Sequence, residues 1–521
     1  MSYQALVFIF VFLPVVWICH RLALRFARPT AKTLLLVASL LFYALGDLSY
    51  LPILAGSVVF NFLVGKHLMH IGRQAKARAW VLGGAISANL LLLAAHKYGL
   101  ISVERAGGIG GVTALAYAGA IPLGMSFYTL QQITYLVDAS HSAKCRSDFS
   151  SYALYVTFFA QIVAGPIVRF SRNRAQFTEL VGRVVNREQL HRGLSLFIFG
   201  LAKKVVVADS LGRIVNPIFA HVAEGGTPSL LAAWLAAYGF LLQIYFDFSA
   251  YSDMAVGIGL MFGILLPINF NSPLQAVSPT DFFGRWHITL SAFIRDFVFL
   301  PTLNLIRRLT PGERARRMIV AWSVATPISL MAVGLWHGAT ITFVLWGLLG
   351  GLNAVVFQLM TIRRKVRLTG KRRFHMPRWG RRVIILLTLP IITLLVRVEQ
   401  VGEAWVFLCG MFGWSPTAGS SLTTLFKGAA DDFAVMNGFR QITESPAYAI
   451  IGVGAAFAIT LWAPNTNSIF NLTHDDAVEV APTRLRWCES ITWAIFTGCV
   501  LTIAIAFIGY RSPLPVIYGQ F

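Results

Sequence analysis

The feature that most constrains this chain is the repetition of long apolar runs along nearly its whole length. A helix needs about 20 apolar residues to cross the roughly 30 Å hydrocarbon core of a bilayer, and such runs recur from 4–19 to 489–509. Charged residues make up only 13% of the 521 residues, which is about half of the fraction in an ordinary soluble chain. The pattern predicts an all-α polytopic membrane protein.

The apolar runs also indicate how many times the chain crosses the bilayer. They predict about eleven to thirteen transmembrane helices in one domain over residues 1–521. The runs lie at 4–19, 33–47, 51–65, 79–95, 112–136, 152–168, 193–208, 229–246, 254–268, 318–335, 339–361, 383–397, 446–463 and 489–509, and a short run at 404–414 is not counted.

Composition and missing motifs exclude several classes of function. The formal net charge of +22 does not predict nucleic-acid binding, because the charged residues lie in loops between apolar runs. The five cysteines are scattered and odd in number, so they predict neither a disulfide framework nor a metal cluster. The sequence contains no G-x-S-x-G elbow, P-loop, H-E-x-x-H or C-x-x-C motif. Serine or cysteine hydrolases, NTPases and zinc enzymes therefore lack support.

The distribution of Lys and Arg over the short loops predicts the orientation, because cytoplasmic loops are enriched in these residues. The first and third loops are basic and the second is not, which places the N-terminus outside the cytoplasm. The basic residues of these two loops are Arg21, Arg25, Arg28, Lys32, Lys66, Arg73, Lys76 and Arg78. The segment 362–382 is strongly basic without an acidic residue, which predicts a cytoplasmic anchor against anionic lipid.

Run 152–168 departs from this alternation. Basic residues flank it on both sides, with Lys144 and Arg146 before it and Arg169 after it, so it is predicted to enter the bilayer and return. Re-entrant backbone is tolerated only where protein shields it or where it lines a cavity. The segment AGPIVRF, residues 164–170, supplies a Gly-Pro bend, and Arg169 is predicted to mark the interface.

His337 interrupts a long uncharged stretch between Arg317 and Arg363. Both ends are predicted to be cytoplasmic, so the stretch crosses twice and His337 lies deep in the membrane near its turning point. Gly334 and Gly338 flank it and permit a close backbone approach or a bend. An ionisable side chain in the membrane costs roughly 2.5–3.5 kcal/mol and is a candidate functional residue. A lone histidine on an apolar face is nevertheless more often a hydrogen-bonded core residue.

A second histidine, His287, is the third residue of an amphipathic segment, RWHITLSAFIRDFVFLP. His287, Ser291 and Arg295 lie four apart and form a polar line at helical spacing. This line is either hydrogen-bonded locally or faces the cytoplasmic mouth of a cavity. The helix is predicted to lie at the cytoplasmic interface or to enter the protein from that side, and to end at Pro301. The apolar residues that share the neighbouring face are Trp286, Leu290, Phe293, Ile294 and Phe297.

Two further polar breaks occur between apolar runs. Asp247 and Asp253, in YFDFSAYSDMAVGIGL, are six apart and share no helix face, so they do not form an acid/base pair. They are predicted to cap and join two helices. Asn269 and Asn271, in INFNSP, form a similar break. Histidine as a general base is the chemistry that the polar residues support.

Several segments, taken in order, resemble the membrane-bound O-acyltransferase (MBOAT) family, and specifically its bacterial alginate O-acetyltransferase branch. The likeness runs from the N-terminal spans to the C-terminal VIYGQF. It is most specific in NFNSP, followed by RWHITLSAFIRDFVFLP and then GLWHGATITFVLWG. The other segments that carry it are PLGMSFYTLQ, AGPIVRF, GLAKKVVVAD and DFSAYSDMAVGIGL.

The resemblance implies that His337, in the L-W-H-G motif, is the catalytic residue. It also implies that His287, in the R-W-H motif, lines the same tunnel from the cytoplasmic side. The other candidate tunnel residues are Trp336, Arg285, Trp286, Ser291, Arg295, Asp247, Ser249, Asp253, Asn269 and Asn271. The sequence departs from its relatives at Phe283, Gly284, Ile341 and Gly350, which leaves the substrate branch open.

The motifs therefore predict a multi-pass O-acyltransferase of the bacterial inner membrane, in contact with lipid. His337 is expected to act as general base on an acceptor hydroxyl, with acetyl-CoA or an acyl-carrier thioester as donor and with neither a permanent cofactor nor a metal. The acceptor is an exported polysaccharide or a serine of a periplasmic relay protein. A transporter or channel of a polysaccharide export system would instead show an inverted internal repeat. A non-catalytic scaffold would tolerate replacement of both histidines.

Overall fold

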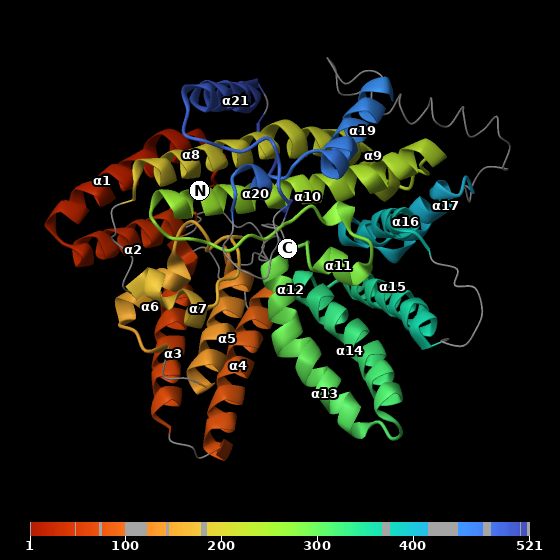
Figure 1. Ribbon diagram of the computed structural model, residues 1–521, viewed down its shortest axis with the longest axis horizontal. Coiled ribbons are helices and arrows are strands. Elements are labelled where there is room, and N and C mark those ends of the chain that lie inside the picture. The colour runs from red at the N-terminus through yellow and green to blue at the C-terminus, as the bar shows by residue number, and fades with distance from the viewer. Residues whose placement is uncertain are drawn as a thin grey trace, which may run out of the picture. The chain divides into compact units, whose positions relative to one another are not determined.

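A computed structural model of the chain describes residues 2–46, 48–71, 75–98, 122–141, 145–178, 185–366, 376–414, 446–472, 481–510 and 512–517. These residues form helices joined by turns and extended segments, and none of them is in a strand (Figure 1). They cluster into two compact units that are interleaved along the chain. Unit 1 comprises Met1–Ala202, Ala250–Ile268 and Thr466–Gln520, and unit 2 comprises Lys203–Ser249 and Asn269–Asn465. The single domain predicted over residues 1–521 stays a prediction.

Each unit contains helices, and one helix, α10 Leu230–Met261, contributes residues to both units. The helices of unit 1 are η1 Phe8–Phe12, α1 Leu13–Phe26, α2 Arg28–Ala44, η2 Leu48–Tyr50, α3 Leu51–His70, α4 Ala75–Lys97, α5 Met125–His141, α6 Phe149–Thr157, α7 Phe170–Thr178, α8 Arg187–Ala202, α20 Thr466–Ile469 and α21 Ile491–Tyr510. Those of unit 2 are η5 Lys203–Ala208, α9 Asp209–Ala223, η6 Pro273–Gln275, α11 Pro279–Phe283, α12 Ile288–Ile294, η7 Arg295–Phe299, α13 Leu300–Leu309, α14 Arg314–His337, α15 Ile341–Val366, α16 Arg378–Arg397, α17 Val401–Met411 and α19 Pro446–Trp462.

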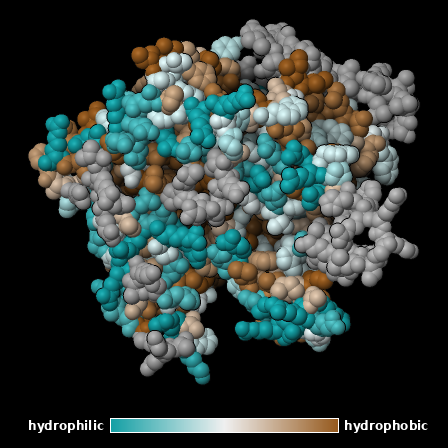
Figure 2. All heavy atoms as spheres, in the orientation of Figure 1, coloured by the Kyte–Doolittle hydropathy of each residue, from teal (hydrophilic) through white to brown (hydrophobic). Residues whose placement is uncertain are grey.

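Long apolar helices dominate the described residues. Nine helices in this part of the chain have the length and composition to cross a membrane, and shorter apolar helices lie at Pro29–Ala44, Val401–Met411 and Ala449–Trp462. Figure 2 shows apolar side chains, in brown, at the molecular surface, and Ile495 on α21 is 63% exposed. Lipid, unlike water, accepts such a surface at no cost. The chain is therefore an all-α polytopic membrane protein, as predicted.

The prediction that Asp247 and Asp253 join two helices is wrong. Both residues lie inside one helix, α10, which runs without a break from Leu230 to Met261. A buried charge is costly in an apolar helix, so two carboxylates in an apolar stretch favour a break between helices. Asp247 is instead paired with a lysine, Lys204, inside unit 2.

The prediction that the amphipathic helix ends at Pro301 is also wrong. The helix begins at Ile288 and continues through the π-helix η7 into α13, which ends at Leu309. Pro301 occupies one of the first two positions of α13, and the π-helix η7 ends directly before α13 begins. A π-bulge changes the local hydrogen-bond pattern, so a proline is accommodated there with less loss than in a regular helix.

The segment predicted to be re-entrant contains only a short helix. α6 has 9 residues, which at 1.5 Å per residue is about 14 Å and too short to cross a bilayer. The non-helical residues 158–169 follow it, and the Tyr155 hydroxyl donates a hydrogen bond to the Val168 carbonyl at 2.7 Å. Protein therefore shields this irregular backbone, as a re-entrant segment requires.

Candidate active site

His337 is presented by the hairpin of α14 and α15. It is the last residue of α14, and Gly338 caps the helix in an extended conformation before α15 begins at Ile341. A Cβ atom at Gly334 would lie 2.2 Å from the Phe343 carbonyl oxygen, and one at Gly338 would lie 2.3 Å from the Phe343 ring. The two glycines therefore permit the close approach predicted from their spacing, and His337 lies at the predicted turning point.

Aromatic rings surround the His337 imidazole. Its ring centroid lies 4.7 Å from that of Trp336, 5.7 Å from that of Trp346 and 6.0 Å from that of Phe343, and the residue is 5% exposed. The carboxyl end of a helix carries partial negative charge and stabilises a positive charge placed there. A histidine that accepts a proton becomes positively charged, so this place at the end of α14 suits a general base.

His287 is held at the start of α12 by a backbone pairing between two motifs. The Asn271 N–H donates to the Arg285 carbonyl, and the Ile288 N–H donates to the Asn269 carbonyl, both at 2.9 Å. His287 itself has a left-handed backbone conformation, with φ of 44°. Such a conformation costs of order 1–3 kcal/mol in a residue other than glycine and is common at functional sites.

The Asn269 side chain sets the tautomer of His287. The Asn269 amide oxygen accepts from the Thr289 backbone N–H at 3.2 Å and from the Thr289 hydroxyl at 3.0 Å. A backbone N–H can only donate, so the atom of the Asn269 amide that faces it must be the oxygen. The same oxygen lies 3.0 Å from His287 Nδ1, which must then donate. In the neutral imidazole this leaves Nε2 as the proton-accepting nitrogen.

Trp336 brings the two histidines into one site within unit 2. Its ring centroid lies 6.4 Å from that of His287 and 4.7 Å from that of His337. The ring centroids of His287 and His337 can therefore lie no further apart than these two centroid distances added together. Phe248 of α10 also contacts His287, edge to face, with ring centroids 4.8 Å apart.

The other predicted site residues separate into those beside the histidines and those elsewhere. Trp286 contacts Phe270 at 5.2 Å, next to His287. Arg285 Nε donates to Asp281 Oδ1 at 2.7 Å, so its guanidinium is held by a carboxylate of α11. Asn271 is 8% exposed and joins the backbone pairing that holds His287.

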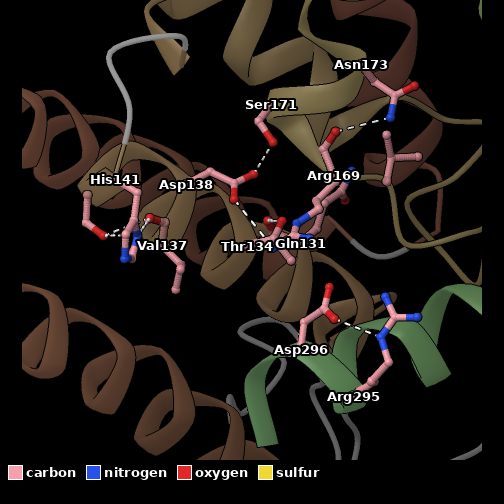
Figure 3. Close-up of polar contacts among 12 residues, drawn as sticks. Gln131, Thr134, Val137, Asp138, His141, Arg169, Ser171, Asn173, Arg295 and Asp296 are labelled. Atoms are coloured by element: carbon pink, nitrogen blue, oxygen red, sulfur yellow. Dashed lines mark hydrogen bonds and ion pairs between the residues drawn. The ribbon is translucent and has the colours of Figure 1, made fainter. Parts of the chain in front are cut away.

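The predicted polar line of His287, Ser291 and Arg295 does not face one direction. The Ser291 hydroxyl turns back to donate to the Trp286 carbonyl at 3.2 Å. Arg295, whose side chain is 60% exposed, donates to its neighbour Asp296 at 2.9 Å (Figure 3). The backbone keeps α-helical hydrogen bonds from Ser291 to His287 and from Arg295 to Ser291, so the side-chain hydrogen bonds, and not the backbone spacing, turn these groups apart.

Three predicted site residues, Asp247, Ser249 and Asp253, lie on α10. The Ser249 hydroxyl donates within the helix, to the Phe246 carbonyl at 3.4 Å. Asp253 is 7% exposed and belongs to unit 1. Asp247 belongs to unit 2 and forms an ion pair with Lys204.

Sequence reasoning missed three residues that contact predicted site residues: Asn465 bonds to Asn271, Phe248 contacts His287 and Lys204 pairs with Asp247. Asn465 donates from Nδ2 to Asn271 Oδ1 at 2.9 Å and to Ser272 Oγ at 2.8 Å, and thus holds the NFNSP segment from a position far along the chain. An apolar residue in an apolar helix gives no signal by itself, and Asn465 stands in a short polar break that resembles an ordinary loop.

A separate polar cluster in unit 1 involves the AGPIVRF segment. Asp138 on α5 accepts a hydrogen bond from the Ser171 hydroxyl on α7, and its carboxylate lies 3.6 Å from the Arg169 guanidinium (Figure 3). Arg169 is therefore paired with a carboxylate, which is compatible with its predicted place at the interface. Across the described part of the chain, no group of three or more His, Cys, Asp and Glu side chains is arranged to hold a metal ion.

Comparisons with known proteins agree with the motifs. Residues 120–396 match the MBOAT, membrane-bound O-acyltransferase family. The chain is 35% identical to a peptidoglycan O-acetyltransferase of Helicobacter pylori over 81% of each protein. It is 32% identical to a probable alginate O-acetylase of Azotobacter vinelandii over 80% of this chain and 78% of that protein. It is 27% identical to a teichoic acid D-alanyltransferase of Streptococcus thermophilus over 45% of this chain and 56% of that protein. The family resemblance predicted from the sequence is confirmed, and the chain belongs to the membrane-bound O-acyltransferase family of membrane-embedded acyltransferases.

Proposed function

We propose that this acyltransferase moves an acetyl group from a cytoplasmic thioester to a hydroxyl group of an exopolysaccharide or cell-wall glycan outside the cytoplasm. The observation that carries the proposal is the convergence of His287, Trp336 and His337 in one buried site. Two relatives, matched over 78–81% of each protein, are named for O-acetylation of peptidoglycan and of alginate, which supports a glycan acceptor. The proposal includes a tunnel that reaches the histidines from both faces.

In this proposal His337 acts as the general base. It takes the proton from the acceptor hydroxyl while that oxygen attacks the thioester carbonyl, and the C–S bond then breaks. The protonated imidazole returns the proton to the thiolate, so the reaction consumes no net proton. The buried aromatic surroundings of His337 exclude water, which would otherwise hydrolyse the thioester. His287, with its tautomer set by Asn269, is placed beside the donor on the cytoplasmic side.

Placement in the bacterial inner membrane, with the N-terminus outside the cytoplasm, is part of the same proposal. It follows from the basic loops, of which the segment 362–382 lies outside the described residues at 367–375.

The test of the proposed function is acetyl transfer across the membrane of proteoliposomes. Purified protein is given [14C]acetyl-CoA or an acetylated acyl carrier protein on one side and peptidoglycan fragments or alginate oligosaccharides on the other. We expect labelled acetate on a glycan acceptor, released by mild alkali as an ester. Uptake of the same glycans without acetylation would instead establish the transporter alternative.

Asn269 provides a second test, because it orients His287 without taking part in proton transfer. We expect Asn269→Ala to lower kcat about 10- to 100-fold, since a small displacement of a reacting group has effects of this size. Asn89→Ala is the matched control. Asn89 is also buried and exchanges amide hydrogen bonds with Asn61, at 2.8 and 3.0 Å in unit 1. Equal kcat losses in the two variants would contradict the assigned role of Asn269.

A further inference from the structure

Three charged side chains are buried together in unit 2. Lys204 Nζ lies 2.8 Å from Asp209 Oδ1 and 2.6 Å from Asp247 Oδ1, and the three side chains are 2%, 5% and 1% exposed. Lys204 and Asp209 are five positions apart, and the π-helix η5 between them has the i to i+5 repeat that places both on one side. Burial costs several kcal/mol per ion unless the charges are paired, so a cluster at this depth is a candidate for a specific role.

One of these charges lies on α10 beside a residue that contacts the histidine site. Phe248 follows Asp247, and its ring centroid lies 4.8 Å from that of His287 and 5.2 Å from that of Phe270. Neighbouring residues of a helix point about 100° apart, so Asp247 faces Lys204 while Phe248 faces His287. A rotation of α10 that separated Asp247 from Lys204 would also move the Phe248 ring away from the imidazole.

We propose that the Lys204–Asp247 ion pair is a positioning element for His287. It fixes the rotation of α10 and thereby holds the Phe248 ring against the imidazole. Both charged residues act through Phe248 and touch no reacting atom. Asp209, on α9, pairs with the same Lys204 ammonium group. Like Asp247 it is buried and charged, but it does not lie on α10. The inference rests on the proposed acetyl transfer and adds residues that position His287 through Phe248.

The test compares Asp247→Asn with Asp209→Asn in the full chain, in proteoliposomes with [14C]acetyl-CoA as donor and peptidoglycan fragments or alginate oligosaccharides as acceptor probes. Each substitution removes one carboxylate charge from the same cluster, and rates are divided by the amount of folded protein. We expect Asp247→Asn to lower kcat about 10- to 100-fold with little change in the donor KM. Asp209→Asn is expected to lower kcat less than about threefold, since α10 keeps its ion pair.

Phe248→Leu supplies a second, independent measurement because it leaves the ion cluster intact. We expect its kcat to fall to a similar extent and to fall no further in the double variant with Asp247→Asn, because the two changes act through one contact. A wild-type kcat for Phe248→Leu overturns the proposal, even if Asp247→Asn does not fold.

Equal losses for Asp247→Asn and Asp209→Asn, or losses that multiply in the double variant, would mean that the ion cluster only stabilises the fold. Those results overturn the positioning role alone. Wild-type protein that transfers acetyl from neither acetyl-CoA nor an acetylated acyl carrier protein overturns the proposed function and this inference with it.

Discussion

Replacement of His337 by alanine is expected to abolish acetyl transfer while the protein remains folded in detergent. General-base catalysis contributes about 10²- to 10⁴-fold to a rate, and the rings of Trp336, Phe343 and Trp346 surround the imidazole that would supply it. The measurement is transfer of [14C]acetyl to the glycan probes per folded protein, with folding followed by gel filtration. His337→Gln, which keeps a polar side chain but cannot exchange a proton near neutral pH, should be equally inactive.

His96→Ala is the matched control for His337→Ala. His96 is 3% exposed in the last turn of α4, and its Nδ1 hydrogen-bonds to the Leu92 carbonyl of the same helix at 3.0 Å. Its removal deletes a buried imidazole that the proposed chemistry does not use, so acetyl transfer should continue. Acetyl transfer by His337→Ala at a rate close to that of His96→Ala would refute the general-base role.

Gly347→Val is expected to have the largest effect on stability. A Cβ atom at Gly347 would lie 2.3 Å from the Leu330 carbonyl oxygen and 2.7 Å from the Met331 Cα, both backbone atoms of α14. Backbone cannot turn aside as a flexible side chain can, so α14 and α15 must separate. We expect a loss in free energy of unfolding at or above the roughly 1–3 kcal/mol typical of overpacking. Thermal unfolding in detergent measures this loss, and acetyl transfer should fall with it because the same hairpin carries His337.

Gly350→Ala tests whether the loss at Gly347 comes from contact rather than from replacing a helical glycine. Gly350 lies three residues further along α15, and the nearest atom to a Cβ there is the Leu330 Cδ1 at 3.7 Å. That is an ordinary van der Waals distance. Alanine favours a helix over glycine by roughly 0.5–1 kcal/mol, so Gly350→Ala should unfold at the same temperature or slightly higher. A Gly347→Val protein as stable as Gly350→Ala would disprove the close packing of the hairpin.

The position of His337 was predictable because it depends on patterns that are local in sequence. An uncharged stretch with basic residues at both ends must cross and return, and two glycines beside a histidine mark where the turn can be tight. The structure ends α14 at His337 and brings Phe343 against both glycines. The same local reasoning failed for α10 and for Pro301. Asp247 is paired with Lys204, a partner outside the local sequence, and Pro301 directly follows the π-helix η7, which apolar periodicity does not predict.

The sequence by itself determined that the chain is a bundle of apolar helices in a membrane, with two histidines in motifs typical of acyl transfer. The length of the apolar runs and the positions of the charged residues determine this. Each polar group exposed to the bilayer has its own free-energy cost, and these costs can be summed along the sequence. Only the tertiary structure decided which side chains meet: Trp336 between His287 and His337, Asn269 on His287 Nδ1, and Lys204 on Asp247. These contacts depend on how helices distant in sequence pack, and periodicity within one helix carries no information about its neighbour.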